Sequence, residues 1–355
     1  MKQTNHCLEL IDRLEQNQIL PDADFRVLLA CEDESVDAYL TARARAVCDR
    51  QFGNKIYIRG LIEISNYCKN DCYYCGIRRS NIQADRYRLS LADILSCCEN
   101  GYESGFRTFV LQGGEDPYFT DDRMVEIIRT VHGRYPDCAI TLSLGEKSKA
   151  TYQRFYDAGA DRYLLRHETA DPAHYGRLHP PELTAEQRRQ CLYDLREIGF
   201  QVGCGLMVGS PYQTVEHLIA DLKFMHELQP HMVGLGPFIP HKDTPFHDRQ
   251  AGTLNDTLRM LAITRLVLPQ VLLPATTALS TIHERGRELG VLAGANVIMP
   301  NLSPADVRPK YLLYDDKLCT GAEAAESLGD LKAQMLAIGY EIVTARGDSP
   351  LILSH

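Results

Sequence analysis

Short apolar runs alternate with amphipathic stretches along most of this chain. Apolar runs of strand length, bounded by Gly, Pro and Asp, predict eight strands. They cover residues 57–65, 107–112, 139–143, 162–166, 200–207, 232–235, 271–274 and 296–299. Between these runs, apolar positions recur with the 3.6-residue period of an amphipathic helix. The expected helices cover residues 91–104, 121–134, 150–158, 185–198, 215–228 and 254–268.

The regular alternation of strand and helix is typical of an α/β fold with a parallel sheet. Eight strand–helix units favour a closed (β/α)8 TIM-type barrel over an open sheet. We expect an N-terminal helical extension over residues 1–50, the barrel over 51–320, and a C-terminal extension over 321–355 that packs on the barrel as a cap. No Ser/Pro/Gly-rich linker separates these parts.

Composition narrows the classes of function. The chain has 355 residues and a formal net charge of -9 without a basic run, which argues against nucleic acid as the main partner. No apolar run approaches the roughly 20 residues of a membrane span. The first ten residues are polar and charged, so we expect no secretory segment. Together with twelve cysteines, this indicates a reducing, cytoplasmic location.

Three cysteines in one short loop are the strongest chemical signal. Cys68, Cys72 and Cys75 directly follow the first predicted strand. Three thiolates can hold three corners of a cubic iron–sulfur cluster and leave the fourth iron open to a ligand. A zinc site would usually need further Cys or His ligands at matching spacing, and a disulfide does not suit a reducing compartment. The remaining cysteines, in apolar or helical stretches, are interpreted as packing residues.

Other candidate residues follow the ends of predicted strands, where a barrel places its active site. Gly113 and Gly114 let backbone approach a ligand closely, although two glycines also simply make turns. Arg166 and Glu168 are two residues apart on a predicted strand, so both should face one side and His167 the other. They either bind a polar ligand or form an internal ion pair.

Two further features have both a functional and a structural interpretation. Arg188 and Arg189 begin a predicted helix, where a guanidinium can grip a carboxylate, yet paired arginines often form a solvated face. Tyr74, inside the cysteine loop, offers a surface on which a flat base can stack, or it simply packs.

The cysteine spacing, with an aromatic residue before the last cysteine, resembles the signature of radical S-adenosylmethionine enzymes. The similarity to one family is more extensive: the chain resembles the HydE family of [FeFe]-hydrogenase maturases from about Leu61 to Cys319. The matching segments are residues 111–118, 141–146, 158–169, 234–241, 274–278 and 294–301.

The resemblance implies one [4Fe-4S] cluster with an open iron, held by the three cysteines and chelated by S-adenosylmethionine. It implies a set of cofactor-binding residues: Tyr74, Gln112, Gly113, Gly114, Glu115, Glu168, Arg188 and Met207. Among these, Glu168 would contact the ribose and Arg188 the methionine carboxylate. It also implies a substrate cavity lined by Arg166, Thr276, Thr277, Tyr311 and Tyr314. A guanidinium with hydroxyl groups suits a substrate carboxylate.

The same resemblance implies a reaction and partners. Reductive cleavage of S-adenosylmethionine would give a 5′-deoxyadenosyl radical that acts on a cysteine-bound iron carbonyl–cyanide precursor. The partners would be the sister maturases HydG and HydF and an external electron donor. Some relatives carry a second, accessory cluster held by three C-terminal cysteines. Here only Cys319 is present in that region, so we expect a single cluster.

Several alternatives stay open. A methylornithine synthase-like enzyme would share the barrel and rearrange lysine. A biotin synthase-like enzyme needs a second cluster, for which only Cys138 and Cys204 occupy barrel-facing stretches. A non-enzymatic iron–sulfur carrier would not cleave S-adenosylmethionine, and a structural zinc protein would be colourless.

Overall fold

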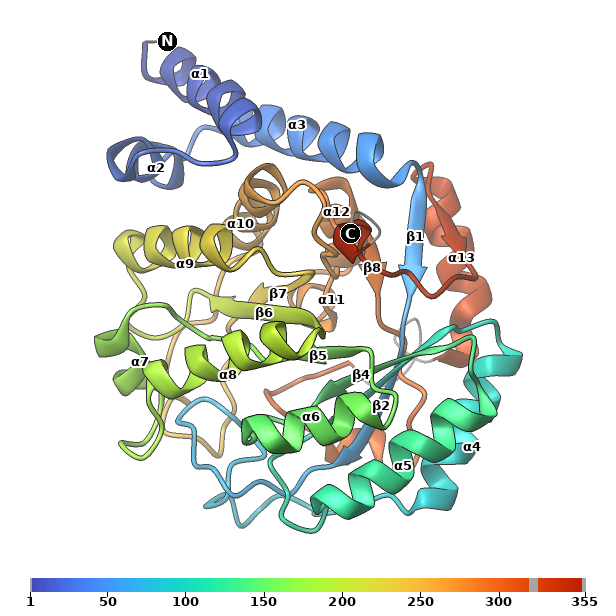
Figure 1. The fold of residues 1–355 in the computed structure, drawn as a ribbon. Helices are drawn as coiled ribbons and strands as arrows, with labels where there is room; N and C mark the ends of the chain where they lie inside the picture. The colour runs from blue at the N-terminus through green and yellow to red at the C-terminus, as the bar shows by residue number, and fades with distance from the viewer. Residues whose placement is uncertain (1, 319–324, 353–355) are drawn as a thin grey trace.

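Six parallel strands form the main sheet of the computed structural model, which describes residues 2–318 and 325–352. Their order, β2-β3-β4-β5-β6-β7, follows the order along the chain (Figure 1). The strands are β2 (Gly60–Ser65), β3 (Thr108–Gly113), β4 (Ala139–Ser143), β5 (Arg162–Leu164), β6 (Gln201–Val208) and β7 (Met232–Pro237). Both β2 and β6 are buried along their whole length, as expected for parallel strands with both faces covered.

A second, three-stranded parallel sheet has the order β8-β1-β9. It is formed by β1 (Lys55–Ile58), β8 (Val297–Ile298) and β9 (Glu341–Val343). The first predicted strand, 57–65, is therefore two strands that belong to different sheets and are separated at Arg59. β9 lies in the C-terminal part, where no strand was expected.

Single parallel bridges lie between the two sheets. Met232 of β7 pairs with Leu272, and Pro274 pairs with Val297 of β8. The strand expected over 271–274 is thus reduced to isolated bridges, because Pro274 has no N–H to donate to a ladder. The two parallel sheets with their outer helices form a partial TIM barrel.

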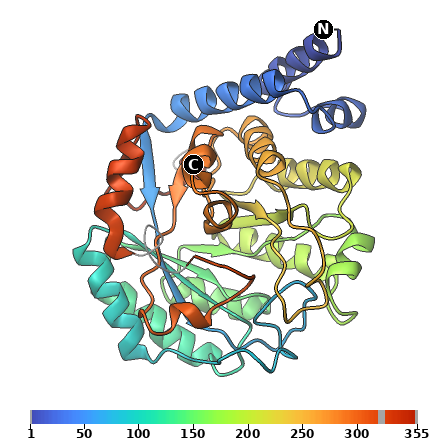
Figure 2. The ribbon, with the colours of Figure 1, turned by 180° about the vertical axis from the view of Figure 1, so that it is seen from behind.

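Helices cover the outside of the strands (Figures 1 and 2). They are α4 (Leu91–Glu103), α5 (Asp121–Arg134), α6 (Lys149–Asp157), α7 (Pro172–Leu178), α8 (Ala185–Ile198), α9 (Val215–Leu228), α10 (Leu254–Val267), α11 (Thr277–Ile282) and α12 (Gly286–Leu292). Several begin at a side-chain cap: Ser90 and Asp93 form a capping box on α4, and Thr184 caps α8. None of the described helices is both long and apolar enough to cross a membrane.

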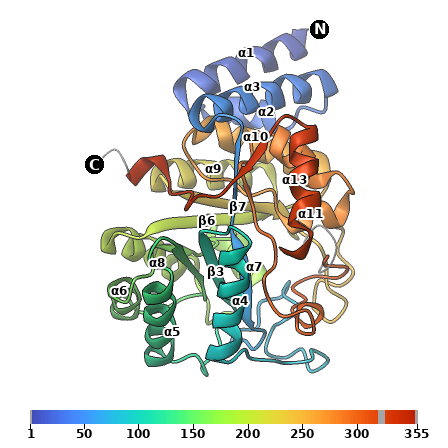
Figure 3. The same ribbon diagram turned by 90° about the vertical axis from the view of Figure 1, so that its right-hand side faces the viewer.

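Three N-terminal helices lie at one end of the molecule (Figure 3). They are α1 (Lys2–Asn17), α2 (Asp22–Leu29) and α3 (Glu34–Phe52), and α3 packs along α10. At the C-terminal end of the chain, α13 (Leu328–Ala337) leads into β9, and short 3-10 turns lie at Arg308–Lys310, Ala325–Ser327 and Pro350–Ile352. Beyond β9, Asp348 accepts a 2.6 Å hydrogen bond from the buried guanidinium of Arg162.

Candidate active site

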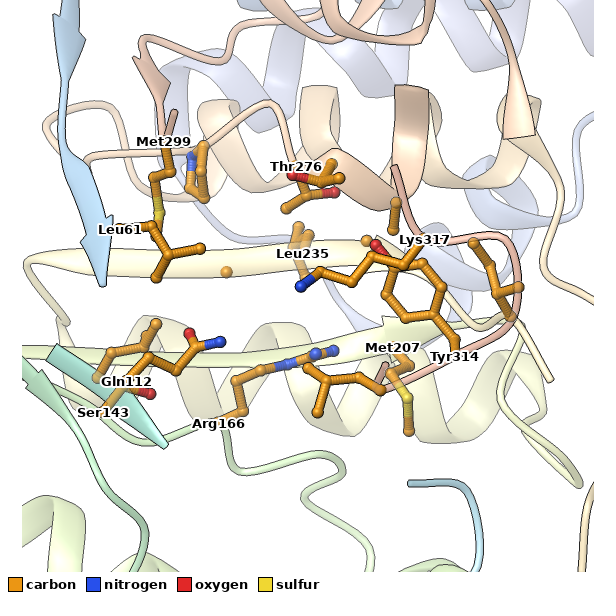
Figure 4. A pocket seen from close by; sticks show the side chains of 18 of the residues that line it. Leu61, Gln112, Ser143, Arg166, Met207, Leu235, Thr276, Met299, Tyr314 and Lys317 are labelled. Atoms are coloured by element: carbon orange, nitrogen blue, oxygen red, sulfur yellow. The ribbon is translucent and has the colours of Figure 1, made fainter. Parts of the chain in front are cut away.

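A cavity of about 330 Å³ lies within the curve of the strands (Figure 4). This is the size of a small-ligand site. Eleven of the residues singled out from the sequence line it: Tyr74, Cys75, Gln112, Gly113, Arg166, Glu168, Met207, Thr276, Thr277, Tyr311 and Tyr314. Gly114, Glu115, Arg188, Cys68 and Cys72 are not part of its lining. The cavity therefore joins the end of the cysteine loop to the polar residues at the strand ends.

The cysteine loop, residues 66–90, connects β2 to α4, and the side chain of Arg86 joins several of its segments. The guanidinium of Arg86 donates to the backbone carbonyl oxygens of Asn66, Ile77, Arg78 and Asn81. A guanidinium has enough donors to hold several carbonyl groups in one arrangement. Hydrogen bonds within the loop thus help to set its path, together with backbone bonds to other segments such as that from Tyr73 to Leu178.

The thiols of Cys68, Cys72 and Cys75 are free and only partly exposed. Burial raises the pKa of all three thiols, that of Cys75 to about 12. Hydrogen bonds from the backbone N–H groups of Asn70 and Glu115 act to lower the pKa of Cys68, because they stabilise its thiolate. N–H donors directed at sulfur are a feature of iron–sulfur sites, where they tune the reduction potential.

The chemistry of the donor set suits an iron–sulfur cluster. Such clusters are held by cysteine thiolates, and three thiolates leave one iron of a cubic cluster open to a ligand. The donor set of three thiols on one preformed loop fits a [4Fe-4S] cluster.

Gly114 lets the end of β3 pass directly against the cysteine loop. A Cβ atom at this position would lie 2.1 Å from the carbonyl oxygen of Tyr67 and 2.8 Å from the Cβ atom of Cys68. The Glu115 carboxylate accepts a hydrogen bond from the amide of Glu146 and pairs with Lys69 at 3.1 Å. In this structure Glu115 thus fixes neighbouring loops, and its contact with a cofactor stays a prediction.

The turn after β5 presents two opposite charges to the cavity. Arg166 and Glu168 were expected to face one side because they alternate along a strand. However, β5 ends at Leu164, and Glu168 has φ +64°, so neither residue belongs to the strand. A tight turn in the left-handed region brings them to the same cavity instead. Their closest atoms, Arg166 Nη2 and Glu168 Oε2, are 3.5 Å apart. His167 points away, as expected: its Nδ1 accepts from the amide of Gly205, and its Nε2 lies 3.4 Å from Asp221.

Both charged groups of this turn have unused hydrogen-bonding capacity. Nε and Nη2 of Arg166 and Oε2 of Glu168 are buried atoms without a hydrogen-bond partner among the described residues. Burying such groups without a hydrogen bond is costly, so they are suited to bind a polar ligand. The two side chains thus form an ion pair and can also bind a ligand. At 3.5 Å their contact leaves these polar atoms without a hydrogen bond.

The side chains of Arg188 and Arg189 point in different directions. Arg188 is buried, and its Nε lies 2.7 Å from a carboxylate oxygen of Glu146. Burial raises the pKa of Glu146, whereas the charge of Arg188 lowers it. Arg188 also lies near enough to favour the thiolate of Cys72. Arg189 instead donates to the carbonyl oxygen of Ala170 at 2.6 Å. Of the two arginines, only Arg188 is directed toward the cysteine loop.

Tyr74 is held in place by a histidine that the sequence did not single out. His179 Nδ1 lies 3.0 Å from the carbonyl oxygen of Tyr175, which can only accept, so Nδ1 carries the hydrogen. Nε2 of His179 then accepts from the Tyr74 hydroxyl at 3.2 Å. Burial lowers the pKa of His179 to about 3, so the ring is neutral. The Tyr74 ring is thereby fixed beside Cys75 at the cavity wall.

A strap of residues 311–318 closes one side of the cavity and carries Tyr311 and Tyr314. Within it, the carbonyl oxygen of Leu313 accepts from the amide of Gly76 at 2.9 Å, and the amide of Asp315 donates to Pro240 at 3.0 Å. The strap is thus attached both to the cysteine loop and to the segment after β7. The Tyr311 hydroxyl lies 3.4 Å from Nε2 of Gln112.

Thr276 and Thr277 lie at the start of α11, just after the bridge at Pro274. The Oγ1 atom of Thr276 is buried and has no hydrogen-bond partner in the described structure. Met207, on β6, contributes an apolar wall. Thr276 and Met207 are seen at opposite sides of the cavity in Figure 4.

Two charged lining residues were missed from the sequence. Glu63 of β2 is fully buried, and Lys317 reaches it from the strap. A carboxylate inside an apolar strand is a signal that the sequence offered, because a buried charge requires a partner. Lys317 gave no such signal, since its position depends on the path of the strap.

Apart from Cys75, the cysteines that the structure describes do not line the cavity. Cys138 and Cys204 are completely buried and pack in the core. Of the cysteines within residues 2–318 and 325–352, Cys75 alone lines the cavity. Cys319, the basis of the single-cluster prediction, lies outside the described residues.

The chain is similar to several known proteins. Residues 62–225 match the model of the radical SAM superfamily. The chain is 41% identical over 311 residues to the [FeFe] hydrogenase maturase subunit HydE of Thermotoga maritima, covering 88% of both chains. It is 30% identical over 309 residues to 3-methylornithine synthase of Methanosarcina barkeri, covering 86% of this chain and 87% of the other. A crystal structure of methylornithine synthase superposes with a TM-score of 0.80 at 26% identity, over 94% of this chain and 97% of that one.

Proposed function

This chain belongs to the HydE family of radical SAM enzymes, and we propose that it acts in maturation of the [FeFe]-hydrogenase active site. The observation that supports this most directly is one cavity that joins Cys75 to the unsatisfied guanidinium of Arg166. One end offers a radical-generating site and the other a site for an anionic substrate.

The residues of the cysteine loop would bind the cofactors. Cys68, Cys72 and Cys75 would hold one [4Fe-4S] cluster, which when reduced supplies the electron that cleaves S-adenosylmethionine to methionine and a 5′-deoxyadenosyl radical. Glu168 would accept from the ribose hydroxyls, and Arg188 would bind the methionine carboxylate. Gln112, Gly113, Gly114 and Glu115 would lie along the methionine, and Tyr74 and Met207 would form the wall around the nucleoside.

The other end of the cavity would hold the substrate, a cysteine-bound iron carbonyl–cyanide complex. Arg166 would pair with the carboxylate of its cysteine, and Thr276, Thr277 and Tyr314 would add hydroxyl donors, with Tyr311 beside them. The enclosed wall would keep water and competing hydrogen donors away from the radical. HydG would supply this complex, HydF would receive the product, and an external donor would reduce the cluster.

We extend the proposal to the architecture. The bridges at Leu272 and Pro274 support a ring of eight strand positions closed between β7 and β8. Residues 1–50 would form the N-terminal extension, 51–320 the barrel and 321–355 the C-terminal extension. The free thiols throughout the described chain support a cytoplasmic location, where thiols stay reduced.

A second candidate is a methylornithine synthase-like rearrangement of lysine. It is supported by the identity of 30% and the TM-score of 0.80 to proteins of that name. The higher identity of 41% to HydE favours hydrogenase maturation.

The test is anaerobic reconstitution with iron and sulfide, reduction, and measurement of 5′-deoxyadenosine. The native protein should bind roughly four irons and form 5′-deoxyadenosine, and Cys72→Ala should do neither. Addition of the iron complex should increase turnover, and addition of lysine should not. A native protein that binds four irons without forming 5′-deoxyadenosine would contradict the radical assignment. Stimulation by lysine alone would favour the second candidate.

A further inference from the structure

A buried ion pair lies in the cavity wall, where β2 meets the strap. Glu63 has no exposed surface, and the side chain of Lys317 is only 7% exposed. Nζ of Lys317 donates to Oε1 of Glu63 at 2.5 Å, while Oε2 of Glu63 accepts from Asn301 at 2.9 Å. Both carboxylate oxygens therefore have a partner within the protein. A buried pair of this kind is weak evidence for stability and calls for another explanation.

The ammonium group of Lys317 carries three N–H donors. It donates to Glu63 and, at 2.9 Å, to the carbonyl oxygen of Tyr311, and no third hydrogen bond is formed with the described residues. Its Nζ also lies 4.8 Å from the centre of the Tyr311 ring. Both Lys317 and Glu63 line the cavity. Each oxygen of Glu63 already accepts one hydrogen bond, so this pair offers a ligand the remaining donor of Lys317.

Lys317 and Arg166 extend into the same cavity from different segments, Lys317 from the strap and Arg166 from the turn after β5 (Figure 4). Two cations with unused donors around one cavity suit a ligand that carries acceptors at two places. Arg166 has the planar donor geometry of a carboxylate site, whereas an ammonium acts as a point donor. The two groups are therefore suited to different parts of one substrate.

We propose that Lys317 is a substrate-binding residue that donates its third N–H to an anionic ligand on the iron of the substrate, and that Glu63 is the positioning residue that fixes its ammonium group. The inference rests on the proposed function. A metal-bound cyanide has an anionic nitrogen that accepts a hydrogen bond, whereas a metal-bound carbonyl is a poor acceptor. Lys317 thus distinguishes the cyanide side of the complex, while Arg166 holds the carboxylate.

The test compares reconstituted full-length variants with the synthetic iron carbonyl–cyanide–cysteine complex as substrate and free L-cysteine as a competitive inhibitor. Removing one partner alone leaves a buried charge unpaired, so the main variant is the double substitution Lys317→Met with Glu63→Gln. Lys317→Arg retains the charge. The matched control is Lys310→Met, because Lys310 precedes the strap and forms a surface ion pair with Asp85.

The double variant should retain native iron content, because neither residue belongs to the three cysteines that would hold the cluster. Its KM for the complex should rise about tenfold or more, as expected for loss of a hydrogen bond to a charged group. Lys317→Arg should recover part of this loss, and Lys310→Met should match the native protein. Inhibition by L-cysteine should not change, since it engages only the end at Arg166.

Two results would overturn the role of Lys317 without affecting the proposed function. One is an unchanged KM for the complex. The other is an equally large loss of inhibition by L-cysteine, which would indicate a general collapse of the cavity. If the native protein does not turn over the complex at all, the proposed substrate fails, and the role of Lys317 fails with it.

Discussion

The amide of Gly76 donates to the carbonyl oxygen of Leu313 at 2.9 Å. Gly76 directly follows Cys75, the one cysteine of the loop that lines the cavity. Leu313 lies on the strap between Tyr311 and Tyr314, which also line it. One backbone hydrogen bond therefore joins the cysteine loop to the segment that carries three of the substrate-side residues, and the two ends of the site are positioned together.

Gly76→Ala should separate these two segments. A Cβ atom at this position would lie 2.3 Å from the backbone carbonyl oxygen of Leu312 and 2.3 Å from the ring of His241. Overpacking of this kind costs roughly 1–3 kcal/mol. We expect lower iron content after reconstitution and weaker stimulation of turnover by the iron complex, measured as bound iron and 5′-deoxyadenosine.

Gly133→Ala is the matched control for this substitution. Gly133 lies in α5, and a Cβ atom there would have no neighbour within 4 Å. Alanine within a helix should stabilise the protein by roughly 0.5–1 kcal/mol and leave iron binding unchanged. Equal iron content in Gly76→Ala and Gly133→Ala would contradict the proposed coupling.

Arg86→Lys should loosen the cysteine loop without removing its charge. An ammonium cannot reach the four carbonyl oxygens that the guanidinium of Arg86 holds. Loss of one or two hydrogen bonds corresponds to roughly 1–3 kcal/mol. We expect faster proteolysis within residues 66–90 and lower cluster retention. Arg79→Lys, on an exposed position of the same loop, should show neither effect.

Arg188→Lys and Arg189→Lys should differ although the residues are adjacent. Arg188 is buried toward the cysteine loop, whereas Arg189 is bonded to the carbonyl oxygen of Ala170. Replacing a guanidinium that grips a carboxylate should raise the half-saturating concentration of S-adenosylmethionine about tenfold in Arg188→Lys only. Titration of 5′-deoxyadenosine formation measures this. A larger effect at Arg189 would reverse the assignment.

His179 should make the folded state sensitive to mild acid. Its pKa is lowered by burial from 6.5 to about 3, so below pH 6.5 the unfolded chain binds a proton that the folded chain does not. Stability therefore falls as the pH decreases from 6.5 toward 3. Between pH 8 and pH 5.5 this group contributes a loss of roughly 1.5 kcal/mol in the free energy of unfolding.

Urea denaturation of the cluster-free native protein and of His179→Phe at both pH values tests this contribution. The variant lacks the titrating ring, so its loss of stability over this interval should be smaller by about that amount. Equal pH dependence in the two proteins would mean that His179 is protonated in the folded state.

Local sequence pattern was sufficient for much of the fold. α5, α8, α9 and β4 have the bounds that periodicity predicts, because their buried positions lie within the segments and a threonine directly precedes each of the three helices as its cap. The pattern failed where pairing is set by distant parts of the chain. The run 57–65 reads as one strand but is shared between two sheets, and β9 has partners only at β1.

The same division applies to the site. The cysteine loop and the turn at Arg166 could be found because their residues are neighbours in sequence. Glu63 and Lys317 are separated by 254 positions, so their contact could not be read from spacing. Neither could His179, which reaches Tyr74 across 105 positions.

β1 is flanked by β8 and β9, so both of its pairings join residues that are far apart in the sequence. Tyr57 pairs with Val297, and Lys55 pairs with Glu341. In the main sheet, by contrast, each strand pairs with the next strand along the chain. Because long-range parallel pairing is slow, the three-stranded sheet is expected to form after the main sheet when the protein refolds.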